Sequence, residues 1–422
     1  MGLVEARPRR AHGRIASVMR RDASTVRPPA SPMMVVAIGM VSIGLGAAMG
    51  FLWGFVATAL RTDLGLARAQ VGVLIGLFFG SAGIGSVGGG ILTDRFGARL
   101  AVALDLVVVA ASCAAVVLVP SYPTLMVASV ICGAAYSLAN AGTNVAIAAA
   151  VPLRQRAIAL TTKTAGVPIM AAVAALMAPW ASVRFGWPSV FGCVAVLATA
   201  ATVAAMVALP PDRPDAVTRR QDRRQLPSGF LWMPVAAFLL ITGSQPLFAW
   251  VVPYLEEAVG VRTAWAGGVS SLATAIGVIG MLLVARRSDR LGPRARLTTV
   301  ATGCLVTAGG IVLTALGAVA GAWLVLVGTG LGLASQLGAI GVMHAAVVDL
   351  APDAVGRASG VTMTGYYLGA LGAPAGFGAV VDRTGTYTIA WGLSALSLVA
   401  AGLAFRRARQ RLVPEPVDER GR

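Results

Sequence analysis

The chain is built from long apolar runs that alternate with short polar gaps. A helix needs about 20 predominantly apolar residues to cross the hydrocarbon core of a bilayer, and a water-soluble core needs no runs of this length. Only 12 % of the residues are charged, whereas soluble proteins carry about a quarter. The sequence therefore predicts an all-α integral membrane protein with twelve transmembrane helices. We place them at residues 33–60, 71–93, 100–119, 123–150, 158–181, 187–209, 229–254, 265–285, 297–318, 321–347, 359–381 and 387–405.

The distribution of arginine predicts how the chain is oriented. Basic clusters occupy the gaps on one side of the predicted bundle, at 95–99, 154–156, 219–224 and 286–296, together with both chain ends. Loops rich in arginine and lysine remain cytoplasmic, so we expect both termini in the cytoplasm. The net charge of +17 does not indicate a nucleic-acid partner, because the arginines alternate with spans and do not form one face. The bias towards Arg, Ala, Gly and Val is typical of a GC-rich bacterial genome, so the expected location is the bacterial inner (plasma) membrane.

The longest polar segment between runs, 210–228, divides the chain into two halves of six runs each. We expect a cytoplasmic tail (1–32), a first bundle (33–209), a cytoplasmic central loop (210–228), a second bundle (229–405) and a second tail (406–422). The halves match at an offset of 195 residues, which pairs Leu60, Gly65, Gly72, Asp94, Arg95, Gly97 and Arg99 with Leu255, Gly260, Gly267, Asp289, Arg290, Gly292 and Arg294. Internal duplication of this kind is the signature of secondary transporters, which bind substrate near the middle of the membrane between their repeats.

The loop after the second run reads Gly90-Ile-Leu-Thr-Asp94-Arg95-Phe-Gly97-Ala-Arg99. It resembles the cytoplasmic signature of the major facilitator superfamily, G-x-L-x-D-R-x-G-x-R/K, and a partial copy follows the eighth run. The resemblance implies two pseudo-symmetric six-helix bundles that work by alternating access. It also implies that the two loops form a gate, with Asp94, Arg95, Gly97, Arg99, Asp289, Arg290 and Arg294 as its residues. The alternative is that the Asp-Arg pair only stabilises a short charged loop.

The only lysine of the chain, Lys163, lies in an apolar run with no other charge from Ala157 to Trp180. An intramembrane ammonium usually faces a cavity or a partner, because exposure to lipid is costly. The alternative is snorkelling, since Arg156 lies about 10 Å away along a helix and the lysine stem can reach towards the headgroups. The local pattern Lys-x-x-Gly-x-Pro resembles that of superfamily members in the organic-anion and cyanate-like groups. The second half carries no equivalent charge, which favours a substrate-specific role for Lys163.

Polar residues recur on one face of the fourth run, where Tyr136, Asn140 and Asn144 are spaced one helical turn apart. In the superfamily, spans 1, 4, 7 and 10 line the central cavity. The resemblance therefore implies that Tyr136, Asn140, Asn144, Trp53, Gln245, Trp250 and Gln336 line this cavity. Together with Lys163 and with Tyr366 and Tyr367, which lie in the counterpart of the Lys163 segment in the second half, they make up the predicted substrate site. The alternative is that these side chains form hydrogen bonds between packed helices.

Two further ionisable residues lie within runs. His344 is interpreted as a gating or coupling residue that carries a proton, with a local hydrogen bond as the alternative. Asp105, in the third run, either pairs with Lys163 or snorkels.

The sequence thus predicts a secondary transporter of a small organic solute, with an anion favoured by Lys163. The alternative is a proton-coupled multidrug efflux antiporter. An enzyme is not expected, because no carboxylate cluster, histidine pair or metal-binding set occurs within reach of one face. An ATP-driven pump is not expected either, because a P-loop requires Gly-Lys-Ser/Thr and the only lysine follows Thr162. A sensor would be expected to carry a soluble output domain, and no gap is long enough for one.

We therefore expect no cofactor, no metal and no nucleic acid as partners. The four cysteines lie within apolar runs without CxxC spacing, so they do not indicate a disulfide or metal framework. The expected partners are a small-molecule substrate and the lipid bilayer, with coupled protons as an open question. We expect a monomer.

Overall fold

The computed structural model describes residues 31–209, 225–352 and 354–413, so most of both predicted tails and of the central loop lies outside the described residues. Nearly all of the described chain is helical, and it contains no strand. The first half comprises α2 (Pro32–Phe55), α3 (Ala57–Leu64), α4 (Arg68–Phe96), α5 (Ala98–Leu118), α6 (Tyr122–Ala150), α7 (Leu153–Thr164), α8 (Gly166–Phe185) and α9 (Pro188–Ala208). The second half comprises α10 (Trp232–Ser244), α11 (Pro246–Ala249), α12 (Val251–Glu257), α13 (Thr263–Leu291), the 3-10 turn η2 (Pro293–Ala295), α14 (Arg296–Ala320), α15 (Ala322–Leu350), α16 (Val355–Thr384) and α17 (Tyr387–Leu412).

Three of the predicted spans are interrupted helices. The run 158–181 is split into α7 and α8 at Ala165, and the run 229–254 is split into α10, α11 and α12 at Gln245 and Trp250. Pro168, Pro246 and Pro253 follow or adjoin these breaks. Proline lacks a backbone N–H and clashes with the carbonyl four residues earlier, so it interrupts a helix at this point. The run 33–60 is also split, into α2 and α3, at Val56.

Eleven helical segments of the described chain are long and apolar enough to cross a membrane. The predicted run 359–381 is not among them, but it lies within α16, a continuous helix of 30 residues. The glycines, threonines and two tyrosines of α16 lower its hydropathy without shortening it. It packs lengthwise against α4, which runs through the membrane-spanning bundle.

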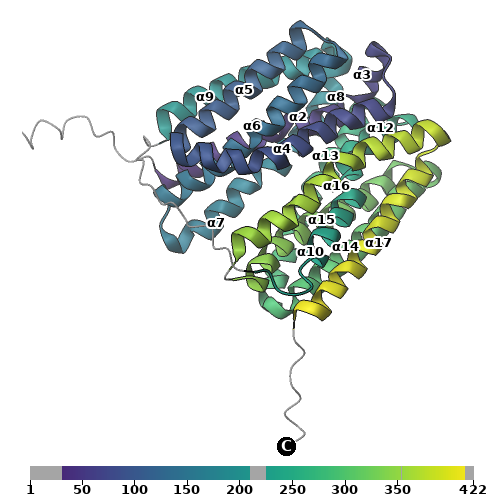
Figure 1. Ribbon diagram of the computed structural model, residues 1–422. Helices are drawn as coiled ribbons and strands as arrows, with labels where there is room; N and C mark the ends of the chain where they lie inside the picture. Colours follow the sequence, from purple (N-terminus) through teal and green to yellow (C-terminus); the bar gives the residue numbers. More distant parts are fainter. Residues whose placement is uncertain (1–30, 210–224, 353, 414–422) are drawn as a thin grey trace, which may run out of the picture.

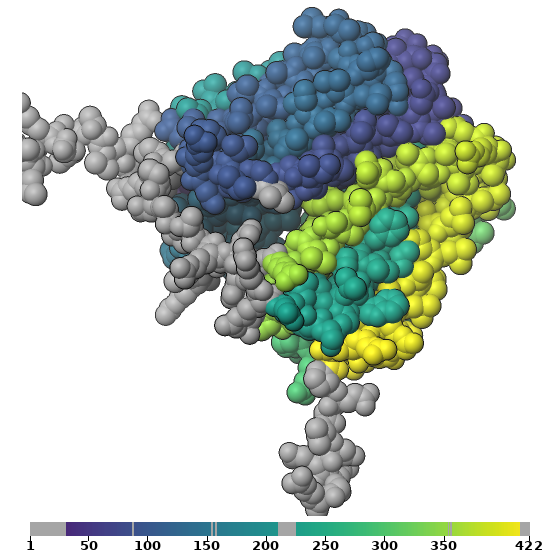
Figure 2. All heavy atoms as spheres, viewed as in Figure 1, coloured from purple at the N-terminus to yellow at the C-terminus, as the bar shows by residue number. Residues whose placement is uncertain are grey.

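The two halves of the chain form two bundles of equivalent construction (Figure 1). In the first bundle, α6 packs against α4 and α5, and α5 packs against α9. In the second, α15 packs against α13 and α14, and α14 packs against α17. The bundles meet along α4 with α16 and along α8 with α13, and Figure 2 shows the first of these seams on the visible face.

Two glycines related by the internal repeat allow these seams to form. A methyl group on Gly72 of α4 would lie 2.3 Å from the carbonyl oxygen of Pro374 in α16. A methyl group on Gly267 of α13 would lie 2.4 Å from the carbonyl oxygen of Ala175 in α8. Gly72 and Gly267 are 195 residues apart, so the repeat carries a glycine at one close backbone approach in each seam.

The bundles are closed at one end only. We call the end with the start of α2 and the end of α17 the terminal side, and the opposite end, with α3 and α12, the distal side. In the distal half, Gly54 of α2 meets Ala249 of α11, and Gly378 of α16 meets Arg68 of α4. On the terminal side, α7 packs against helices of the first bundle and α10 packs against helices of the second, and the described residues of these two helices make no extensive contact with the opposite bundle. The described chain is therefore sealed distally and opens towards the terminal side.

Candidate functional site

Lys163 is held between three helices of the first bundle. It lies at the end of α7, two residues before the helix breaks at Ala165, and its side chain is only 1 % exposed. Its Nζ atom donates hydrogen bonds of 2.9 Å to Oδ1 of Asn140 and to Oδ1 of Asn144, both on α6. A methyl group on Gly39 of α2 would lie 3.3 Å from Cγ of Lys163, so a glycine leaves room for the lysine stem. This is not the geometry of a snorkelling side chain.

The lysine fixes the orientation of both asparagine amides. An ammonium group has only donors, so the amide oxygens must face it and the Nδ2 groups must lie on the other side of each amide. Asn140 and Asn144 are exposed, and their Nδ2 atoms donate to no residue of the described chain. The site therefore presents N–H donors with a positive charge behind them. This arrangement suits an anion, because hydrogen bonds to an ionised acceptor are stronger than those to a neutral one and the lysine charge lies close behind the donors.

Tyr136, the third residue of the predicted stripe, lies beside Asp105 and takes no part in the hydrogen bonds of Lys163. Its ring is 6.0 Å from that of Phe78. Asp105 is 0 % exposed, and neither of its carboxylate oxygens has a hydrogen-bond partner in the described chain. Asp105 thus neither pairs with Lys163 nor snorkels in this conformation.

Two of the predicted aromatic wall residues are buried within helix contacts. Trp53 packs on Phe191 of α9, with 4.6 Å between the ring centroids, inside the first bundle. Trp250 donates from Nε1 to the carbonyl oxygen of Pro374 at 3.1 Å and stacks on Phe377. In this conformation neither indole is exposed.

The remaining predicted substrate residues come from the second bundle. Gln245 and Gln336 are buried, and Oε1 of Gln336 has no hydrogen-bond partner in the described chain. Tyr366 and Tyr367 are half-buried on α16, with their rings edge to face at 5.5 Å. The structure therefore joins Lys163, Asn140 and Asn144 by hydrogen bonds, and it places Tyr366 and Tyr367 near Tyr136 of the first bundle. A role in substrate binding stays a prediction for each of these residues.

The two signature loops have the same backbone shape. Helices α4 and α13 end at Gly97 and Gly292, whose φ angles are +87° and +79°, a region that favours glycine. Asp94 is exposed and forms no ion pair within the described chain, whereas the Asp289 carboxylate lies 3.9 Å from the guanidinium of Arg296.

The other predicted gating residues lie nearby on the terminal side. The guanidinium of Arg95 lies over the ring of Phe96, Arg99 is half-buried, and Arg290 and Arg294 are exposed. His344 forms a local bond of 2.8 Å from Nδ1 to the carbonyl oxygen of Ile340. Gating by these residues stays a prediction.

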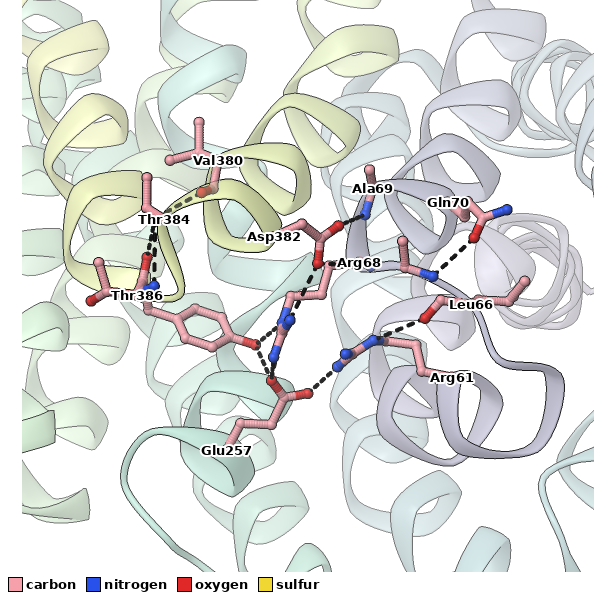
Figure 3. A network of polar contacts seen from close by, with 12 residues as sticks. Arg61, Leu66, Arg68, Ala69, Gln70, Glu257, Val380, Asp382, Thr384 and Thr386 are labelled. Atoms are coloured by element: carbon pink, nitrogen blue, oxygen red, sulfur yellow. Dashed lines mark hydrogen bonds and ion pairs between the residues drawn. The ribbon is translucent and has the colours of Figure 1, made fainter.

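A polar network that sequence reasoning missed joins the bundles on the distal side (Figure 3). Glu257 at the end of α12 accepts hydrogen bonds from Arg61 and Arg68 of the first bundle, and from the hydroxyl of Tyr387 at 3.0 Å. Asp382 of α16 accepts from Arg68 at 3.2 Å and from the backbone N–H of Ala69 at 2.9 Å. The sequence feature that could have predicted this network is the occurrence of acidic residues close to the few arginines in the polar segments on the distal side. We call these five side chains, Arg61, Arg68, Glu257, Asp382 and Tyr387, the distal network.

A sequence model of the Major Facilitator Superfamily matches residues 36–374. The chain belongs to this superfamily. It is a multi-pass membrane transporter that carries out secondary transport by alternating access. The structure, sealed at the distal network and open on the terminal side, fits one state of such a cycle.

Two characterised proteins are similar in sequence to this superfamily member. The transcription regulatory protein OpdE of Pseudomonas aeruginosa is 28 % identical over 399 residues, which covers 89 % of this chain and 94 % of OpdE. The 4-hydroxybenzoate transporter PcaK of Acinetobacter baylyi is 25 % identical over 138 residues, which covers 33 % of this chain and 30 % of PcaK.

Solved structures of transporters share the fold of this superfamily member. A D-xylose-proton symporter superposes with a TM-score of 0.74 at 16 % identity, covering 91 % of this chain and 98 % of the symporter. A bacterial homologue of the human lysosomal transporter Spinster superposes with a TM-score of 0.73 at 16 % identity, with the same coverage of both chains. At these identities the likeness concerns the fold alone.

Proposed function

We propose that this transporter carries a small organic anion and that the anion's carboxylate binds at the exposed amide groups of Asn140 and Asn144. The observation that carries this proposal is the hydrogen bonding of Lys163, which turns both amide oxygens inwards and leaves the Nδ2 donors free for an acceptor. The buried ammonium supplies positive charge behind these donors. An anion offsets the cost of that buried charge, whereas a cation would add to it.

The similarity to PcaK supports the same class of solute. That protein is named for the transport of 4-hydroxybenzoate, a molecule with one carboxylate. The other predicted residues, Tyr136, Gln245, Gln336, Tyr366 and Tyr367, would orient the remainder of the solute once the bundles close around it. Trp53 and Trp250 would support the apolar walls.

We infer from the arginine distribution that the terminal side, and with it both termini, faces the cytoplasm of a bacterial cell. On this assignment the described conformation opens inwards, and the distal network closes the outer side. Transport then requires the network to break and the terminal halves of the bundles to meet.

Two other functions compete with anion transport. A proton-coupled multidrug antiporter would handle cationic or neutral solutes, for which a buried lysine offers no binding energy. A regulatory role is favoured by the similarity to OpdE over most of the chain. Transport by the purified protein in liposomes separates these functions, because a protein that only regulates moves no solute.

The test is counterflow in proteoliposomes with labelled carboxylates, 4-hydroxybenzoate among them, and with amino acids and cationic dyes for comparison. We expect Lys163→Ala to abolish binding of the transported anion while the protein stays folded, because both amides lose their fixed orientation. Lys163→Arg should retain part of the affinity, since the charge remains but its shape changes. Thr162→Ala, an exposed neighbour on the same helix, is the matched control. Unchanged anion affinity in a fully expressed Lys163→Ala variant contradicts the proposal.

A further inference from the structure

We propose that Asp105 is a proton-binding site, separate from the site at Lys163, and that a proton bound there travels with the anion. The proton site rests on the geometry of the first bundle alone. Only the coupling to an anion rests on the proposed function.

Asp105 lies in the middle of a helix contact with nothing to stabilise a negative charge. It is fully buried on α5, and both carboxylate oxygens lack a hydrogen-bond partner among the described residues. An unpaired carboxylate in such surroundings carries the full cost of desolvation, whereas the protonated acid avoids it. The carboxyl group is therefore neutral in this conformation and holds a proton.

The helices packed around Asp105 supply no cation that would favour the charged form. The titratable groups that face it come from α6 and are Tyr136 and Cys132. Helix α2 has no ionisable residue between Pro32 and Phe55, and the only titratable group of α9 is the exposed Cys193. Helix α4 carries charged residues only at its two ends, at positions 68, 94 and 95.

The packing also favours a proton over a metal cation. A methyl group on Gly46 of α2 would lie only 2.8 Å from Oδ2 of Asp105 and 3.3 Å from Cδ2 of Tyr136. The backbone of α2 therefore packs directly on the carboxyl group. A hard metal cation requires several oxygen ligands around it, and these helices leave no room for them.

The proton site and the anion site share two helices. On α2, Gly39 meets Lys163 and Gly46 meets Asp105, seven residues or about 10 Å along the helix. On α6, Tyr136 next to Asp105 is one turn from Asn140, which binds Lys163. A shift of α2 against α6 therefore changes both sites at once. It lets a proton bind from water on one side and leave to water on the other, together with a monovalent anion.

The first experiment concerns the proton site and needs no substrate. We expect infrared difference spectra of the purified protein in liposomes at neutral pH to show a carboxylic-acid C=O band that is lost in Asp105→Asn. Asp63→Asn is the control, because Asp63 accepts a 2.9 Å hydrogen bond from Trp187 near the distal surface and should not contribute to the band. Asp105→Leu gives a second variant, and isotopic labelling of aspartate carboxyl carbons shifts the band in the wild type without any substitution. An unchanged spectrum in the variants, or no shift on labelling, overturns the proton site.

The second experiment concerns coupling and uses 4-hydroxybenzoate with a pH-sensitive dye trapped in the liposomes. We expect uptake of the anion to bring protons with it in the wild type. Asp105→Asn should still exchange labelled for unlabelled anion. Its accumulation of the anion in response to a pH gradient should be at least ten-fold lower than that of the wild type. A purely structural role for Asp105 would slow exchange and accumulation alike, which overturns the coupling. If 4-hydroxybenzoate is not transported at all, the result counts against the proposed substrate, while the infrared band still decides the proton site.

Discussion

Neutralising Glu257 is expected to open the distal side of the transporter. Glu257→Gln keeps the shape of the side chain but removes the charge that both Arg61 and Arg68 contact. The three side chains are 18–23 % exposed, so water partly screens the two ion pairs and each contributes about 1 kcal/mol. Their loss weakens the sealed state by about 2 kcal/mol, which lowers the ratio of sealed to open molecules about 30-fold.

The assay measures the distance between spin labels on the two bundles. Thr62 of α3 and Arg262, which precedes α13, are exposed positions on either side of the distal network. Labels attached to cysteines at these two positions report the distal opening by double electron–electron resonance. In Glu257→Gln we expect a longer distance to gain population relative to the background with intact Glu257.

The matched control is Glu256→Gln, which removes one negative charge at the adjacent position. Glu256 forms no ion pair in the described chain, and its carboxylate lies near the hydroxyls of Thr58 and Thr263, which a glutamine can also contact. The control should therefore leave the distance distribution close to that of the parent. If Glu257→Gln leaves the distribution unchanged, or if Glu256→Gln changes it equally, the distal network does not hold the bundles together.

Two further predictions concern the terminal side. Cysteines introduced in 210–228 should react with an impermeant thiol reagent only from the cytoplasmic side, since arginine-rich loops remain inside; labelling from outside reverses the proposed orientation. Asp94→Asn should insert normally but transport much more slowly. The exposed carboxylate of Asp94 is expected to form a hydrogen bond or an ion pair only when the terminal side closes, and the neutral amide would weaken that contact. Wild-type exchange rates in the purified Asp94→Asn variant would leave the signature loop with a structural role.

The sequence predicted the elements with a strong local signal. Helical spacing predicted that Asn140 and Asn144 share one face of a helix, and the isolated charge of Lys163 predicted a partner or a cavity. In the structure both amides accept hydrogen bonds from Lys163. The family signature predicted two six-helix bundles. These predictions succeed because spacing along one helix fixes which side chains share a face.

The features that the sequence did not predict depend on the relative position of distant helices. Glu257 is 189 residues from Arg68 and 130 residues from Tyr387, and no periodicity connects such residues. The sequence also could not predict which way Trp53 points, because α2 is apolar on all sides and has no polar face that would indicate its orientation. The tertiary contact with Phe191 alone places that indole inside the first bundle.

The glycines of the internal repeat provide a separate test of how the bundles close. In Gly267→Ala the new methyl group would lie 2.4 Å from the carbonyl oxygen of Ala175 and 3.0 Å from Cγ of Pro179, so the backbone of α8 must move. Overpacking of this kind costs about 1–3 kcal/mol. Because the contact joins the two bundles in their distal halves, we expect a lower melting temperature and a larger population of the long distance between labels at Thr62 and Arg262.

The adjacent glycine supplies the control for this prediction. A methyl group on Gly268 meets nothing within 4 Å beyond its own helix, so Gly268→Ala should keep or raise stability by about 0.5–1 kcal/mol through helix propensity. Gly72→Ala should behave like Gly267→Ala, since it places a methyl group against the carbonyl oxygen of Pro374 at the seam between α4 and α16. Equal effects of Gly267→Ala and Gly268→Ala would mean that the change in helix propensity, and not close approach of the bundles, determines how the substitution at position 267 affects stability. A difference confined to Gly267→Ala and Gly72→Ala would show that the repeat retains glycine because the bundles must touch backbone to backbone to seal the distal side.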